Sequence, residues 1–296
     1  MIVEFSATDT ASLKIFISID ESRSRWRSYS CKNIFPKNIP MNLLSYTLHL
    51  IGSGATAYVM SHNMRDRQTR PDLLAGLQLA ESGSVPFLEA LSQRAIAEGD
   101  LWLADKLTTH AQDERRHGQI FAHGLKRLNK QVIDFKTTAE KMADSKPDDR
   151  RRSPFFDAYY QGYDKASLAP DQVDWLVFFA STHILELHAS KDFVRMANAL
   201  PDDDLASINL KKGILNIAED EKGHAAYLLE AMERRLPAGN VMNLVDQWRS
   251  RKVDAMMAMV KNLLQKGGKF PSMAQDGVPS EMSDSVTNEA TEQIAA

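Results

Sequence analysis

The sequence contains a single cysteine, Cys31, among its 296 residues. One thiol cannot form a disulfide within the chain, and it cannot provide the several thiolates of an iron–sulfur cluster or a multi-cysteine zinc site. Disulfides are rare in reducing compartments, so a chain without a pair of cysteines suits such a compartment. We therefore expect the protein to be cytoplasmic.

The sequence also lacks a strong excess of charge of either sign. It has 36 lysines and arginines against 39 aspartates and glutamates, which gives a formal net charge of −3. A protein that binds the phosphate backbone usually has a basic excess, so we expect no nucleic-acid duplex as a partner. Hydrophobic residues make up 43% of the chain and charged residues 25%, and both values are typical of a globular protein.

Long hydrophobic runs are scarce. The longest uncharged stretch, 41–60, has about the length of a membrane span. Polar residues such as Asn42, Thr47 and His49 interrupt it, so we expect it to dock against the rest of the protein and expect no membrane contact. Residues 1–40 show no helical periodicity, and Met41 would serve as an alternative start of translation. We interpret 1–70 as an N-terminal extension that is partly irregular.

The rest of the chain divides into a long helical part and a polar tail. Residues 267–296 have few large apolar side chains, so we expect a disordered tail there. Between 71 and 266, apolar residues recur with helical periodicity and no sustained alternation indicates strands. The expected helices cover 72–98, 100–129, 170–199 and the residues from the turn at 200–202 to 236, with a fifth at 241–265.

The links between these helices define the expected topology. The links at Gly99 and Pro201 are short, so each consecutive pair of helices must be antiparallel. The segment 130–169 is long enough to cross over between the two pairs. The sequence therefore predicts an all-α fold, in which two antiparallel helical hairpins are joined by a long crossover and followed by an extra C-terminal helix.

Two of the predicted helices contain the motif Glu-x-x-His. Glu114 and His117 form the first copy, and Glu221 and His224 form the second. This spacing places both side chains of a pair on one helix face. Such pairs commonly lie on solvated faces, but here each pair lies within the apolar stripe of its helix. Because a buried carboxylate is very costly unless a cation or hydrogen bonds compensate it, the pattern indicates metal ligands.

The other two long helices each have one glutamate in their apolar stripe. Glu81 precedes Glu114 by 33 residues, and Glu186 precedes Glu221 by 35 residues. Glu89 is an alternative to Glu81, but it lies on a polar stripe. Four carboxylates and two imidazoles suit two divalent metals that share bridging carboxylates, and these donors fit iron or manganese.

On these residues the chain resembles the ferritin-like diiron-carboxylate superfamily, which includes rubrerythrin, bacterioferritin and diiron oxygenases. The resemblance covers about 72–236, and its six motif positions are filled by Glu81, Glu114, His117, Glu186, Glu221 and His224. It implies a ferritin-like four-helix bundle that holds two iron ions, or one manganese and one iron.

The resemblance also implies roles for the neighbours of the ligands. Asp113 and Asp220 directly precede the motif glutamates, and in similar proteins such an aspartate accepts the outer N–H of the histidine of the other motif. Arg116 matches a residue that supports the site in oxygen-activating relatives, and the second motif has no such arginine. His110 and His183 lie one helical turn before ligand glutamates. Each is a candidate for an extra ligand, although a hydrogen-bonded core histidine is the more common role.

The resemblance implies an enzyme, namely a diiron oxidase or monooxygenase that uses dioxygen to oxidise or hydroxylate a small organic substrate. An external electron donor is then expected as a partner, and a homodimer is compatible with the sequence. The main alternative is iron oxidation or storage of the ferritin or bacterioferritin type, and a third is a non-catalytic bundle stabilised by metal. The sequence does not define the substrate, because specificity depends on pocket residues.

Overall fold

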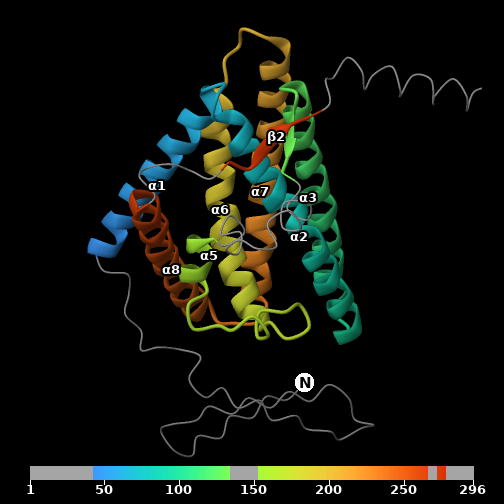
Figure 1. Cartoon of the computed structure of the whole chain (residues 1–296). Helices are drawn as coiled ribbons and strands as arrows, with labels where there is room; N and C mark the ends of the chain where they lie inside the picture. Colours follow the sequence, from blue (N-terminus) through green and yellow to red (C-terminus); the bar gives the residue numbers. More distant parts are fainter. Residues whose placement is uncertain (1–42, 134–152, 266–271, 278–296) are drawn as a thin grey trace, which may run out of the picture. The chain divides into compact units, whose positions relative to one another are not determined.

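The structure is a computed structural model that describes residues 43–133, 153–265 and 272–277 (Figure 1). The described residues are mostly helical, as predicted. The helices are α1 (Leu43–Arg65), α2 (Arg70–Glu98), α3 (Leu101–Arg127), α5 (Pro154–Tyr159), α6 (Trp175–Ala199), α7 (Leu205–Glu233) and α8 (Ala238–Gln265). Two short strands, β1 (Lys130–Val132) and β2 (Ala274–Asp276), complete the set. Residues 1–42, including Cys31 and the proposed start at Met41, lie outside the described part.

Aspartate caps begin three of the long helices. The Asp100 side chain accepts a hydrogen bond from the Leu103 amide at 3.0 Å, directly after Gly99 ends α2 in the left-handed conformation. Asp174 caps α6 and Asp204 caps α7 in the same way. Because each aspartate satisfies amides that have no partner within the helix, these caps fix where α3, α6 and α7 start. Helix α6 therefore begins at Trp175, five residues later than the periodicity of 170–199 predicts.

The four predicted ligand-bearing helices pack as two antiparallel pairs. Helix α2 packs along α3, α6 packs along α7, and the pairs meet where α3 contacts α7. Helix α8 and the short α5 cover one end of α6, and α1 lies against α6 and α8 (Figure 1). The expectation that 41–60 docks against the protein agrees with the position of α1. None of the described helices is long and apolar enough to cross a membrane.

The buried apolar side chains form two separate clusters along the four long helices. One cluster includes Leu91, Leu107, Phe179 and Leu228, together with residues of α5 and α8. The other includes Leu74, Phe121, Phe193 and Ile214, together with Met64 of α1. In every one of the four helices, the predicted ligand glutamate lies in the sequence between the residues of one cluster and those of the other. A polar layer thus separates two halves of the core.

The two strands differ from the sequence-based expectation. Strand β1 pairs with β2 in antiparallel register, with Gln131 opposite Gln275. Asp72 of α2 anchors the start of β2, because its carboxylate accepts hydrogen bonds from the amides of Met273 and Ala274 at 2.8 and 2.9 Å. Part of the segment 267–296, expected to be disordered, is therefore ordered strand at 274–276, and the remainder of that segment lies mostly outside the described residues.

A buried lysine, Lys252 on α8, makes stability depend on pH. Its side chain is 8% exposed, and burial lowers its pKa to about 7, although the charge of Asp192 opposes this shift. The folded protein binds this proton more weakly than the unfolded chain does. Below pH 7 the lysine is charged in both states, so burial of its charge lowers the free energy of unfolding by the full amount. Stability is expected to rise as pH increases from about 7 toward the unfolded pKa of about 10.5, by up to about 5 kcal/mol.

Replacing Lys252 by methionine is therefore expected to stabilise the protein at pH 6.5 and to have a smaller effect at pH 9.5. Urea unfolding of both proteins at both pH values measures the difference. Lys261→Met is the matched control, because Lys261 lies on the same helix but is exposed. An equal effect of Lys252→Met at the two pH values would contradict the assignment of the buried charge.

Candidate metal centre

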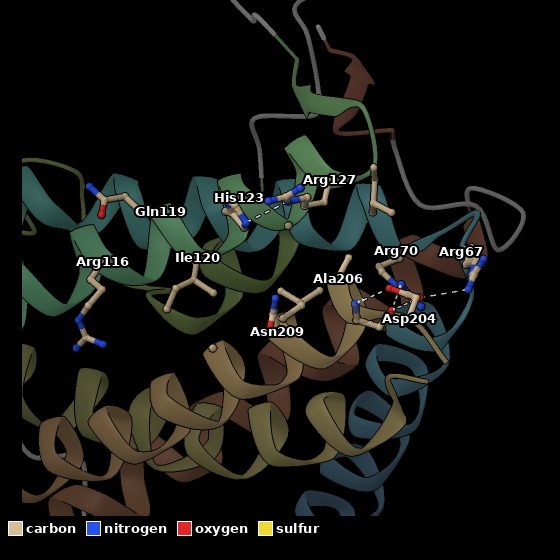
Figure 2. Close-up of a pocket in the computed structure, with 15 residues that line it drawn as sticks. Arg67, Arg70, Arg116, Gln119, Ile120, His123, Arg127, Asp204, Ala206 and Asn209 are labelled. Atoms are coloured by element: carbon tan, nitrogen blue, oxygen red, sulfur yellow. Dashed lines mark hydrogen bonds and ion pairs between the residues drawn. The ribbon is translucent and has the colours of Figure 1, made fainter. Parts of the chain in front are cut away.

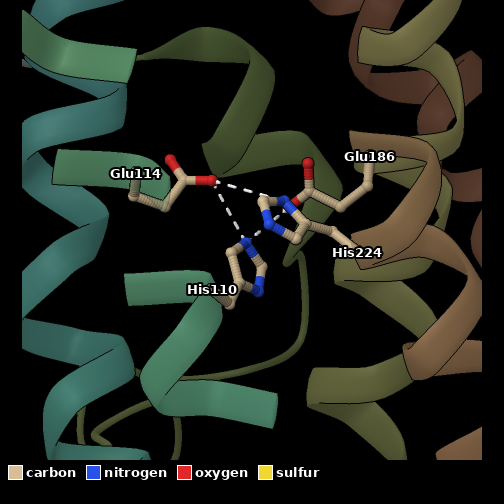
Figure 3. A group of neighbouring side chains, drawn as sticks. All are labelled: His110, Glu114, Glu186 and His224. Carbon is tan, nitrogen blue, oxygen red and sulfur yellow. Dashed lines mark hydrogen bonds and ion pairs between the residues drawn. The ribbon is translucent and has the colours of Figure 1, made fainter. Parts of the chain in front are cut away.

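All six residues predicted as metal ligands converge in the polar layer. Two groups of side chains each bring their ligand atoms within 4.8 Å of one another, and either group could hold a metal ion. Glu114 belongs to both groups. One group consists of Glu81, Glu114, His117 and Glu221, and the other of His110, Glu114, Glu186 and His224 (Figure 3).

The choice of Glu81 over Glu89 agrees with the structure. The Glu81 carboxylate is 11% exposed and lies 3.5 Å from Nδ1 of His117. The Glu89 side chain is 52% exposed and pairs with Arg115 on the outer surface at 2.6 Å. The apolar stripe of α2 thus identified which glutamate points inward.

The two motif histidines have the same orientation. In each ring, Nδ1 points to the carboxylates: Nδ1 of His117 lies 3.2 Å from Glu221, and Nδ1 of His224 lies 3.1 Å from the other oxygen of the same carboxylate. Each Nε2 points outward to the aspartate of the opposite motif. His117 donates to Asp220, and His224 donates to Asp113, both at 3.2 Å. The crosswise pairing implied by the resemblance is therefore present.

One arginine supports both aspartates. Arg116 donates to Asp113 at 2.6 Å and to Asp220 at 3.0 Å. The second motif has Gly223 where the first has Arg116, and the single guanidinium serves both halves of the site. Hydrogen bonds from His224 and Arg116 lower the pKa of Asp113 to about 2, so this carboxylate is ionised. The ionised Asp113 fixes the tautomer of His224 in which Nε2 carries the proton and Nδ1 is free to bind a metal.

The two candidate extra ligands differ in position. His110 joins the site, because its Nε2 lies 3.1 Å from Glu114 and 3.5 Å from Glu186. Its ring stacks on His224 with 3.7 Å between the ring centroids. His183 does not join either group, and its Nδ1 lies 2.8 Å from the carbonyl of Ala225, to which it can donate. His183 is thus a hydrogen-bonded core histidine.

Two further side chains near the site were not predicted. The phenol oxygen of Tyr227 lies 2.7 Å from Nδ1 of His110, and the Ser84 hydroxyl donates to Glu114 at 3.1 Å. Tyr227 follows His224 by three residues, the same spacing as that between Glu221 and His224. It therefore lies on the same face of α7, one helical turn after His224. That spacing is the signal from which Tyr227 could have been found.

The protonation of the site reflects burial of several carboxylates together. Burial raises the pKa of Glu186 to about 8, and the neighbouring charge of Glu221 acts in the same direction. Burial also raises the pKa of Glu81. Although burial alone would lower the pKa of His117, the carboxylates of Glu221 and Glu81 close to its Nδ1 raise it to about 10. Without a cation, Glu81 and Glu186 therefore hold protons more readily than exposed glutamates do.

The donor set fits a metal centre. Nδ1 of His117 is fully buried, has no hydrogen-bond partner and faces the carboxylates of Glu81, Glu114 and Glu221. A buried polar atom without a partner is rare and calls for an explanation. A cation bound between this nitrogen and the carboxylates would satisfy all of them together, and oxygen and imidazole donors suit iron or manganese.

Tyr227 is expected to hold His110 as a ligand. When Nδ1–H of His110 donates to the phenol oxygen, Nε2 has its lone pair toward Glu114 and Glu186. Removing the hydroxyl by Tyr227→Phe should weaken metal binding to the group that contains His110 by about tenfold, the usual effect of losing such a partner. Anaerobic titration with Co²⁺, followed by its visible absorption, measures this change. Tyr58→Phe, at an exposed tyrosine of α1, is the control, and identical titrations of all three proteins would contradict the role.

Comparison with protein-family models, with curated proteins and with solved structures finds no match to this chain. The residues of the site and their geometry therefore carry the information on function.

Proposed function

We propose that this protein is a diiron oxidoreductase that uses dioxygen to oxidise or hydroxylate a small organic molecule. In this proposal α2, α3, α6 and α7 form a ferritin-like four-helix bundle, and the polar layer holds two iron ions. The observation that carries the proposal is how these side chains converge. Helices α2 and α6 each contribute one glutamate, α3 and α7 each contribute a Glu-x-x-His motif, and together they form two adjoining groups of ligand atoms.

The positions of the side chains suggest a division of roles. Glu114 belongs to both groups, and the two oxygens of Glu221 lie near different histidines, so these glutamates would bridge the ions. Glu81 with His117 and Glu186 with His224 would be terminal ligands. Iron held by these residues would supply electrons for the reduction of dioxygen and thereby for oxidation of the substrate.

The rest of the chain supports these roles in two ways. Asp113, Asp220 and Arg116 hold the histidines in the tautomer that a metal requires. The two apolar clusters on either side of the layer limit the access of water, which strengthens electrostatic interactions within it. An external electron donor would return the ions to the ferrous state after each turnover.

The test is an anaerobic titration of metal-free protein with ferrous iron, followed by addition of oxygen. We expect saturation at two ions per chain, a transient visible absorption after oxygen is added, and repeated oxygen consumption only when a reductant is supplied. Iron that accumulates far beyond two ions per chain would instead indicate storage. Binding of two ions without any oxygen consumption would leave a metal-stabilised bundle, and the absence of stoichiometric iron binding would refute the proposal.

A further inference from the structure

A second concave site lies on the outer side of the helix pair α3 and α7. It is a cavity of about 580 Å³ between these helices and the link from α1 to α2 (Figure 2). This volume is within the range of small-molecule sites, about 300–1,000 Å³. Ile120, Leu128 and Leu210 provide apolar parts of its wall. The close approach of the two helices there depends on Gly213, because a Cβ atom at this position would lie 2.7 Å from the Ile120 side chain.

The charged residues of the wall are mostly of one sign. Four arginines line the cavity: Arg67, Arg70, Arg116 and Arg127. Asp204 is the one carboxylate among the lining residues, and Arg67 binds it at 3.3 Å. Arg116 pairs with Asp113 and Asp220. These two aspartates do not line the cavity, and each is already bonded to a histidine of the metal centre.

Two of the arginines have no carboxylate within hydrogen-bond distance among the described residues. Arg70 is 3% exposed, and its guanidinium donates to the carbonyls of Met64 and Arg65 and to the hydroxyl of Ser207. The Arg127 side chain donates to His123 at 3.4 Å. A buried guanidinium bonded to neutral groups alone is unusual, because a buried charge is normally paired. Arg67 is paired with Asp203 and Asp204, whereas Arg70 and Arg127 give the wall positive charge without a carboxylate partner of their own among the described residues.

We propose that this cavity binds an organic anion that has an apolar body, such as a medium-chain carboxylate. The anionic head would pair with the arginines, and the apolar body would cover Ile120, Leu128 and Leu210. Arg116, Asp113 and Asp220 lie between the cavity and the ligand histidines, so the ligand would not reach the metals from this side. The site is therefore distinct from the metal centre, and binding would occur without metal.

Calorimetric titration of the metal-free full-length chain with octanoate tests the proposal. We expect octanoate to bind at one site per chain with a sub-millimolar dissociation constant. Octanol has the same apolar body without the charge, and acetate has the charge without the body, so each should bind at least about tenfold more weakly. Absence of saturable octanoate binding, or equal binding of octanoate and octanol, would overturn the proposal.

Three variants locate the site. Arg127→Gln removes a positive charge from the wall, and Asn209→Asp adds a negative charge to the wall with almost no change of shape. Each should weaken octanoate binding at least about tenfold, because a charge-assisted contact is lost or a like charge is added. Arg115→Gln removes the same charge from the same helix at a position outside the cavity, and it should bind octanoate like the wild type. Unchanged affinity in both wall variants would refute the location. Because these titrations use no metal, their result is independent of the proposed diiron chemistry.

Discussion

Replacing Glu114 by alanine is expected to reduce the bound iron from two ions per chain to less than one. Glu114 is 4% exposed and is shared by both groups of ligand atoms. One of its oxygens lies 3.1 Å from Nε2 of His110 and 3.7 Å from Nδ1 of His224. Because Glu114 belongs to both groups, its loss would remove a ligand from each of the proposed ions at once.

The measurement is metal analysis after anaerobic reconstitution with ferrous iron and gel filtration. Glu89→Ala is the matched control, since this glutamate is exposed on α2 and pairs with Arg115, and it should retain both ions. His224→Ala should also lose most of the metal, because binding requires the neutral imidazole that Asp113 orients. Full occupancy in both the Glu114 and the His224 variants would show that the ligand set is wrong.

The second large effect concerns stability, because metal binding is expected to stabilise the folded chain strongly. Glu81, Glu114, Glu186 and Glu221 bring four carboxylates into a layer with little exposure to water, and burial raises the pKa of Glu81 and of Glu186. A cation that binds only the folded state adds about 4 kcal/mol when its concentration is a thousand times its dissociation constant. For a chain of this size, that gain corresponds to a rise in the unfolding midpoint of about 10 °C.

Calorimetric or fluorescence-detected melting of the metal-free protein, with and without Mn²⁺ under reducing conditions, measures this rise. Manganese is used because it does not react with oxygen as ferrous iron does. The Glu114→Ala protein should show little or no rise at the same manganese concentration. An equal rise in the wild type and in this variant would mean that the ion stabilises the protein elsewhere.

Much of the fold was predictable because its signals are local. The periodicity of 72–98 and the Gly99–Asp100 break correspond to α2 and to the cap of α3. The strands β1 and β2 could not be predicted, because each has three residues and its partner is more than 140 residues away in the sequence. Three residues are too few to show an alternating pattern. The late start of α6 depends on the Asp174 cap, which competes with helical periodicity in 170–174.

The candidate site was predictable to the extent that it depends on helix faces. The spacing within each motif and the apolar stripes identified the six convergent side chains. The same information could not separate His110 from His183, since each precedes a glutamate by one turn or nearly so. Their hydrogen-bond partners on α7 differ, because Tyr227 meets His110 and the Ala225 carbonyl meets His183. Such contacts depend on how two helices are rotated against each other, and the sequence of one helix does not specify that rotation.

The polar layer has a consequence for how the molecule holds together. The two apolar clusters stabilise the four long helices separately on either side of the polar layer. The helical turns that bear the ligands belong to neither cluster. In the metal-free chain these turns form a seam, where the peptide groups are expected to exchange their hydrogens with solvent more readily than those on either side. Bound ions would link the four helices at this layer, so they would stabilise the contact between the two halves in addition to their proposed role in the reaction.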